Sequence, residues 1–281
     1  MAEVWTVLKV LQWTAEHLAQ KGVENGRLDA ELLLADTLKV DRVGLYLNYD
    51  KPLSPEELTR YREQVKRRAG REPLQYILGH CEFWSLQLQV TPAVLIPRSD
   101  TEVLVEEALK HAQPAATVLD VGTGSGAIAL ALASELPQSR VTGLDQSAQA
   151  LQVAELNCQA LGLQERVELV AGDLFGLSEG EWQLIVSNPP YIPAAEMPAL
   201  MPEVGRFEPA MALDGGSDGL DCYRALARQA SARLVAGGWL LVEVGFDQAE
   251  PVRQIFAAAG LKDIYSRDDY AGISRVVGGR N

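Results

Sequence analysis

The fold of this chain is decided by the stretch Thr117-Val118-Leu119-Asp120-Val121-Gly122-Thr123-Gly124-Ser125-Gly126-Ala127. Its first five residues form the short apolar run that is typical of a buried parallel strand. The glycines that follow let a backbone turn approach a ligand closely, and the apolar residues after Ala127 predict a helix whose N-terminus favours negative charge. The stretch therefore predicts a strand, a ligand-binding turn and a helix, although a tight connection without a ligand would also use glycines.

The next predicted strand, residues 141–145, ends in an acidic residue, Asp145. Because the carboxyl ends of parallel strands meet at one edge of a sheet, this carboxylate is placed to accept hydrogen bonds from both hydroxyls of a ribose bound at the turn. The pattern does not identify the nucleotide. Gly122, Gly124 and Ala127 also have the G-x-G-x-x-A spacing of dinucleotide-binding proteins, so an NAD-dependent oxidoreductase is one candidate.

Strands and helices alternate through the rest of the chain. After a helix predicted at 147–161 come strands at 167–171 and 182–187 and a long loop over 192–220. The elements predicted beyond it are a helix at 217–235, a strand at 239–243, a helix at 248–259, and strands at 262–266 and 272–278. This alternation predicts an α/β fold with a mostly parallel sheet and helices on both faces.

The strand predicted at 182–187 leads into the motif Asn188-Pro189-Pro190-Tyr191. Two adjacent prolines end a strand because neither has an N–H to donate, and proline keeps the residue before it extended. The Asn188 side chain and the Pro189 carbonyl can then both accept hydrogen bonds from one planar N–H₂ group, beside the flat face of Tyr191. The motif predicts a rigid site for such a group; taken alone, it is equally compatible with a plain proline-rich turn.

The first part of the chain has a different pattern. Apolar residues at helical spacing predict helices over 3–21 and 27–38 and a shorter one from Asp41. Ser54-Pro55-Glu56-Glu57 is a capping box that opens a further helix ending at Gly70. Alternating residues then predict a β-hairpin or extended pair over 82–97. The predicted domains are therefore a helical bundle (1–79), an extended linker (80–98) and an α/β domain (99–281).

Composition narrows the class of protein. Residues 1–72 contain 12 Lys/Arg and 12 Asp/Glu, whereas residues 73–281 contain 13 and 26, so the net charge of −13 belongs to the second part. A surface of that sign repels a phosphate backbone, which argues against sequence-specific binding of nucleic acid. The basic cluster Arg60–Arg71 is a local exception, interpreted as the solvated end of a helix or as a contact with nucleic acid or an acidic partner.

The sequence also predicts the compartment. No apolar run approaches the length of a membrane span, and the first residues read as an amphipathic helix and not as a signal peptide. Three widely spaced cysteines and three histidines predict neither a disulfide framework nor a metal site. We therefore expect a cytoplasmic protein without a metal and without a membrane partner.

The pairing of D-x-G-x-G-x-G and a following acid with N-P-P-Y resembles the S-adenosylmethionine-dependent amino methyltransferases. Further stretches resemble the protein-(glutamine-N5) methyltransferases, and among them the bacterial peptide chain release factor glutamine methyltransferases of the HemK/PrmC type. These stretches are Arg71–Gly79, Phe83-Trp84, Leu95–Glu102, Phe207–Pro209 and Ala212–Leu220. The resemblance is strong over about residues 70–245 and architectural before them. Ser99 stands where the family often has proline.

The resemblance implies a Rossmann-like class I S-adenosylmethionine methyltransferase domain, with a small N-terminal helical bundle that docks the substrate and a β-hairpin linker. It implies catalysis by Asn188, Pro189 and Tyr191, which bind the substrate together with Pro190. The residues that it implies for the cofactor are Asp120, Gly122, Thr123, Gly124, Ser125, Gly126, Asp145, Asp173, Leu174 and Asn188. Asp120 would face the cofactor's ammonium group or only cap the turn.

The substrate implied by the resemblance is the glutamine in the Gly-Gly-Gln motif of class I peptide chain release factors, methylated on its side-chain amide nitrogen (N5), with S-adenosyl-L-homocysteine as product. An amide nitrogen is a poor nucleophile, so most of the rate would come from positioning, which can supply on the order of 7–11 kcal/mol. A nucleic-acid adenine N6-methyltransferase is the main alternative, which the acidic domain disfavours. A release-factor binder without catalysis is another.

Overall fold

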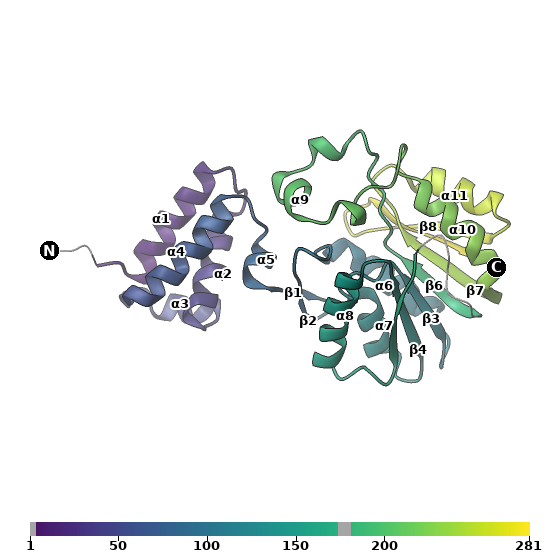
Figure 1. Ribbon diagram of the computed structural model, residues 1–281, viewed down its shortest axis with the longest axis horizontal. Coiled ribbons are helices and arrows are strands. Elements are labelled where there is room, and N and C mark those ends of the chain that lie inside the picture. The colour runs from purple at the N-terminus through teal and green to yellow at the C-terminus, as the bar shows by residue number, and fades with distance from the viewer. Residues whose placement is uncertain (1–3, 174–180) are drawn as a thin grey trace. The chain divides into compact units, whose positions relative to one another are not determined.

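The computed structural model describes residues 4–173 and 181–281, and contacts within it divide the chain into two units (Figure 1). One unit is helical and contains Met1–Gly79 together with Met201–Phe207. The other contains His80–Leu200 and Glu208–Asn281 and is built on a β-sheet. The short segment Met201–Phe207 lies far from the rest of the helical unit in the sequence, and nothing in the amino-acid pattern assigned it there.

The helices of the helical unit are α1 (Val7–Gln20), α2 (Gly26–Leu38), α3 (Arg42–Leu47), α4 (Pro55–Ala69), α5 (Leu74–Leu78) and α9 (Pro202–Phe207). Of these, α1 to α5 pack around one apolar core; α9 belongs to the unit but contributes no residue to that core. The predicted capping box is confirmed: the Glu57 N–H donates to the Ser54 hydroxyl over 3.2 Å, and the Glu57 carboxylate accepts the Ser54 N–H over 2.7 Å. Both ends of this reciprocal pair satisfy backbone donors that the first turn of a helix leaves free.

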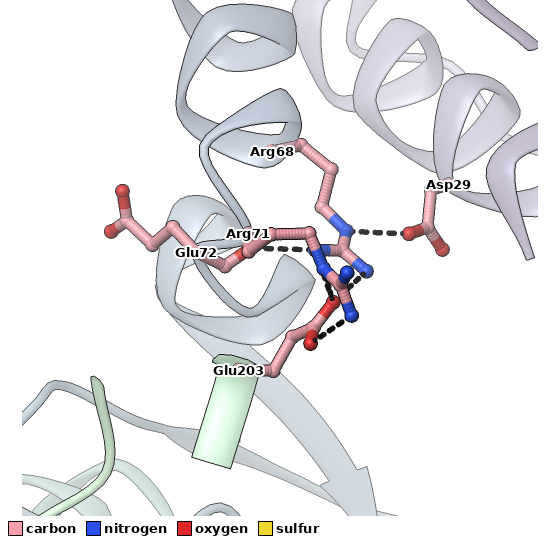
Figure 2. A network of polar contacts seen from close by, with 5 residues as sticks. All are labelled: Asp29, Arg68, Arg71, Glu72 and Glu203. Atoms are coloured by element: carbon pink, nitrogen blue, oxygen red, sulfur yellow. Dashed lines mark hydrogen bonds and ion pairs between the residues drawn. The ribbon is translucent and has the colours of Figure 1, made fainter. Parts of the chain in front are cut away.

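Charged side chains join α9 to the rest of the helical unit (Figure 2). Arg68 donates from Nε to Asp29 over 2.6 Å and from Nη1 to Glu203 over 3.0 Å. Arg71 donates from Nε and Nη2 to the two oxygens of Glu203, each over 2.6 Å. Two arginines of the basic cluster therefore pair with carboxylates of their own unit, and Arg68 is buried.

Glu203→Ala should lower the free energy of unfolding by about 2 kcal/mol, because it leaves two guanidinium groups without their shared partner. The partial exposure of Arg71 keeps this figure below that of a fully buried pair. Urea denaturation of the whole chain measures it. Glu250→Ala removes an exposed carboxylate that pairs with Arg253 and is the matched control, with an expected loss below about 0.5 kcal/mol. Equal losses of unfolding free energy in the two variants would contradict the role of Glu203 as the shared partner of the two arginines.

The second unit begins with a hairpin and continues as one mixed sheet. The hairpin pairs β1 (His80–Phe83) with β2 (Leu86–Gln89); a hairpin was predicted, but over 82–97, and residues 90–97 form no strand. In the described residues the sheet has seven strands in the order β5-β4-β3-β6-β7-β9-β8, antiparallel only at β9. The strands are β3 (Thr117–Val121), β4 (Arg140–Asp145), β5 (Val167–Ala171), β6 (Trp182–Ser187), β7 (Leu234–Glu243), β8 (Lys262–Asp268) and β9 (Ser274–Arg280). The predicted α/β class with a mostly parallel sheet is confirmed.

Helices cover both faces of the sheet (Figure 1). One core contains residues of α6 (Glu102–His111), α7 (Ala127–Glu135) and α8 (Ala148–Ala160). The other contains residues of α10 (Asp221–Arg233) and α11 (Ala249–Ala258). Side chains alternate along β6, with Val186 in the first core and Ile185 in the second, as the two-residue period of a strand requires.

Two segments in the second half of the chain also differ from the sequence-based prediction. β7 begins at Leu234 and not at Trp239, because the strand continues through Gly237 and Gly238 with a shift of register against β6. The predicted loop over 192–220 contains α9 and two 3₁₀ turns, η2 (Met197–Ala199) and η3 (Ala210–Ala212). A third such turn, η1 (Ser99–Thr101), precedes α6.

The strand order reverses direction beside β3. The chain passes from β3 to β4 and β5 on one side, then returns to β6 and β7 on the other. In open α/β sheets such a reversal leaves a crevice at the carboxyl ends of the strands, where ligands bind. None of the helices in the described part of the chain is long and apolar enough to cross a membrane.

Candidate active site

A cavity of about 430 Å³ lies at this reversal point, within the sheet unit. The residues that follow four adjacent strands line it: Gly122 after β3, Asp145 at the end of β4, Gly172 after β5 and Asn188 after β6. The topology therefore brings together the glycine turn, the acidic residue and the asparagine that the sequence singled out.

The glycine turn presents bare backbone to this cavity. Gly122 and Gly124 both line it, with φ of 75° and 58°, a conformation that side chains rarely adopt. A Cβ built on Gly122 would meet no atom within 4 Å, so the space beside it is open. The Gly122 N–H donates to the Leu144 carbonyl over 2.8 Å, which fixes the turn against β4. The turn is a cradle that a ligand can fill.

The Asp145 carboxylate lies beside the cradle and can accept further hydrogen bonds. One of its carboxylate oxygens accepts the Gly124 N–H over 2.9 Å, and the other accepts the Ser147 N–H over 2.8 Å. A carboxylate oxygen can accept more than one hydrogen bond, so each keeps a lone pair for a hydroxyl in the cavity. The open cradle and this doubly anchored acid fit a nucleoside cofactor.

Asp120 lies beneath the turn and is not among the residues that line the cavity. Its Oδ2 accepts from the Thr123 hydroxyl over 2.6 Å and from the Ala129 N–H over 3.1 Å, and within the described residues its Oδ1 has no partner. Thr123 and Ser125 are buried as well, and the Ser125 carbonyl accepts from Asn157 over 2.9 Å. The side chains of Asp120, Thr123 and Asn157 thus form hydrogen bonds at the turn, and none of the three lines the cavity.

Asp120→Asn should change how stability depends on pH. Burial raises the pKa of Asp120 to about 7, so the neutral form stabilises the fold at acid pH and this stabilisation is lost as the pH rises toward 7. The free energy of unfolding of the wild type should therefore fall by about 2–3 kcal/mol relative to the variant between pH 5 and pH 8. Urea denaturation at both pH values measures this; a difference that is constant with pH would contradict it.

The motif after β6 is divided between the cavity and the core. Asn188 and Pro190 line the cavity, whereas Pro189 is buried. The ring of Tyr191 packs against the core under α10 and α11, and burial raises its pKa to about 12. Asp173 is exposed and does not line the cavity, and Leu174 lies outside the described residues.

The 192–220 segment forms another wall of the cavity. The residues that it contributes are Pro209, Met211, Ala212, Asp214, Gly215 and Gly216. The Ile192 N–H donates to the Leu213 carbonyl over 2.9 Å, so this wall is hydrogen-bonded to the chain that follows the N-P-P-Y motif. A Cβ on Gly219 would lie 2.4 Å from the Tyr191 carbonyl oxygen, so the segment packs against that motif more closely than a side chain allows. Arg98, in the predicted linker, pairs with the carboxylate of the buried Glu208.

Sequence reasoning missed several residues at this site. Ala93, Val94 and Leu95 line the cavity, although their apolar pattern indicated only an extended linker. Gln248 donates to the Tyr191 carbonyl over 2.9 Å from the end of a distant loop, which no local motif marks. Among the described residues no group of His, Cys, Asp or Glu is arranged to hold a metal ion.

The sheet order, the glycine cradle and the adjoining acid agree with a methyltransferase domain, and the similarity of the chain to a known family identifies it as one. The Methyltransferase small domain model matches residues 99–201, and the PrmC N-terminal domain model matches residues 9–79. A solved methyltransferase from Pyrococcus furiosus shares the fold, with a TM-score of 0.52 and 18% identity over 69% of this chain and 88% of that one.

The chain belongs to the release factor glutamine methyltransferase family. It is 56% identical to a release factor glutamine methyltransferase of Geobacter sulfurreducens, over 99% of this chain and 98% of that protein. It is 45% identical to one from Moorella thermoacetica, over 96% of each.

Proposed function

We propose that this enzyme transfers a methyl group from S-adenosyl-L-methionine to the side-chain amide nitrogen of the glutamine in the Gly-Gly-Gln motif of class I peptide chain release factors. The observation that carries the proposal is the position of Asn188, which shares one cavity with the glycine cradle and Asp145. The 56% identity to a protein named release factor glutamine methyltransferase supports the choice of substrate.

Gly122 and Gly124 would hold the methionine part of the cofactor against their backbone, and Asp145 would accept hydrogen bonds from its ribose. When bound, the cofactor supplies an electrophilic methyl group on a sulfonium. The shape of the turn would be maintained by Thr123, Ser125 and Gly126. Asp120 would contribute by accepting hydrogen bonds from Thr123 and Ala129. Asp173 and Leu174 are proposed to lie beside the adenine.

The substrate carboxamide would be held by the N-P-P-Y motif. The Asn188 side-chain oxygen and the Pro189 carbonyl would accept its two N–H hydrogens, with Pro190 and Tyr191 supporting the plane of the group. This fixes the nitrogen and favours its attack on the methyl carbon, since alignment replaces the entropy that a free encounter would lose. The extra proton leaves the product nitrogen for water, so no strong base is required from the chain.

The helical unit is proposed to dock the body of the release factor. Between α1 and α4 it has an apolar groove of about 600 Å³, lined in part by Trp5, Trp13 and Tyr61. Lys21, Arg62 and Lys66 also border it, so the groove suits an amphipathic segment with acidic residues.

The three cysteines are all unpaired, which fits a reducing cytoplasm.

Transfer of tritiated methyl groups to a purified release factor tests the proposal. Label should enter the intact factor and not a factor whose Gly-Gly-Gln glutamine is replaced by alanine. A short Gly-Gly-Gln peptide should be a weaker substrate than the intact factor if the helical unit contributes to docking. Label in adenine of DNA or RNA, with none in the release factor, would replace the proposal by the nucleic-acid alternative.

A further inference from the structure

An ion pair beside the cavity has no role in the chemistry proposed above. Arg98 donates from Nη2 to the Oε1 atom of Glu208, and the two residues lie 110 positions apart in the sequence. Both belong to the sheet unit, which also contains the cavity. Neither residue lines the cavity, so any role of the pair in ligand binding has to be indirect.

The residues next to each partner do line the cavity. Leu95 lies a few positions before Arg98, and Pro209 directly follows Glu208. The lining residues that flank the pair are all apolar: Ala93, Val94, Leu95, Pro209, Met211 and Ala212. The ion pair therefore joins two lengths of chain that each supply an apolar part of the cavity wall.

Local hydrogen bonds shape each of these two segments. The Val94 N–H donates to the Thr91 carbonyl over 3.1 Å, and the Ala212 N–H donates to the Pro209 carbonyl over 2.9 Å. Turns of this kind fix the course of one segment but not its distance from the other. The contact between Arg98 and Glu208 links the two segments directly.

Stability alone does not call for a charged pair at this position. The Glu208 side chain is only 2% exposed, whereas that of Arg98 is 40% exposed. Burial of a carboxyl group is costly, and apolar side chains can often replace a buried ion pair without loss of stability. Within the described residues the Glu208 Oε2 atom has no hydrogen-bond partner that would offset this cost. A hydrogen-bonded pair differs from an apolar contact in being directional, so it defines how the two segments lie.

We propose that Arg98 and Glu208 are positioning residues, which hold the two apolar segments together and so keep the cavity in the shape that binds the cofactor. The proposal rests on the proposed function, because it takes S-adenosylmethionine as the ligand of the cavity. A wall that is already in place does not have to be ordered when the ligand binds, so loss of the pair should weaken binding.

Substitutions by methionine test the proposal in the whole enzyme. Arg98→Met removes the donor and Glu208→Met removes the acceptor, and methionine adapts to the space left in each case. Each should raise Kd for S-adenosylmethionine by about 10-fold or more, while kcat at saturating cofactor stays within about threefold of the wild type. The double variant should bind no more weakly than the weaker single variant, because the two residues act as one pair.

Two further variants serve as rescue and control in the same calorimetric titrations. Glu208→Gln keeps an oxygen to which Arg98 can donate, and it should recover most of the affinity lost in Glu208→Met. Arg253→Met removes the exposed partner of Glu250 on α11, away from the cavity, and should bind the cofactor like the wild type.

Hydrogen exchange of the free enzyme gives a readout that does not depend on the ligand. Loss of the pair should speed exchange of the amides of residues 210–216 and leave those of β6 unchanged. Faster exchange throughout the sheet would show that the pair serves only overall stability and would overturn the proposal. Wild-type Kd in a folded Arg98→Met, or additive losses in the double variant, would also overturn it. A wild-type enzyme that does not bind S-adenosylmethionine would instead contradict the proposed function, so the two failures are distinguishable.

Discussion

Asn188→Ala is expected to reduce methyl transfer to the release factor glutamine by about 100-fold or more, the size of loss seen when a preorganised polar contact to a reacting group is removed. The affinity for S-adenosylmethionine should change little, because the cradle and Asp145 lie on other strands. Single-turnover transfer measures the rate, and isothermal calorimetry measures cofactor binding.

The control for Asn188→Ala is Asn48→Ala, which removes an exposed asparagine side chain of the helical unit. That variant should retain the wild-type rate. Asn188→Ala with wild-type turnover would exclude the asparagine from the chemistry. A variant that lost turnover and cofactor affinity together would show that Asn188 serves mainly to bind the cofactor.

Asp145→Ala is expected to weaken S-adenosylmethionine binding by more than about 100-fold, since hydrogen bonds from two ribose hydroxyls to a charged acceptor are worth about 1.5–3 kcal/mol each. The same substitution removes the acceptor for the Gly124 N–H, so part of the loss comes from a looser cradle. Calorimetric titration of the cofactor measures the loss directly.

Two further variants separate these contributions to the Asp145→Ala result. Asp145→Asn keeps one oxygen acceptor and should lie between wild type and alanine. Glu168→Ala removes an exposed carboxylate on the neighbouring strand β5, away from the cavity, and should bind the cofactor like the wild type. Unchanged affinity in Asp145→Ala would remove the ribose assignment.

The strands could be predicted because their signals are local. The strand over 182–187 is a continuous apolar run closed by two prolines, and its predicted bounds agree with those of β6. The capping box at Ser54 marks the start of a helix, and α4 begins at the next residue, Pro55. Gly237 and Gly238 weakened the prediction for the next strand, because glycine gives no strand signal even where the backbone continues.

The parts of the site that could not be predicted depend on contacts between distant residues. The hydrogen bond from Asn188 to Thr101 joins residues 87 positions apart in the sequence, and the periodicity of the sequence does not reveal it. The burial of Asp120 under its own turn depends on where Thr123 and Ala129 point once the helix has formed. An aromatic side chain such as Tyr191 is equally typical of a core and of a substrate site, so the sequence could not predict that it packs against the core.

The route of the chain through α9 bears on any attempt to work with the methyltransferase half alone. Within the described residues the ion-pair partners of Glu203 all precede His80, whereas Pro209, a few positions later, already lines the cavity. A fragment that starts at His80 would keep Glu203 but lose Arg68 and Arg71, a few residues before the segment that lines the cavity. The whole chain is therefore the better protein for measurements of methyl transfer, because it keeps the partners of Glu203.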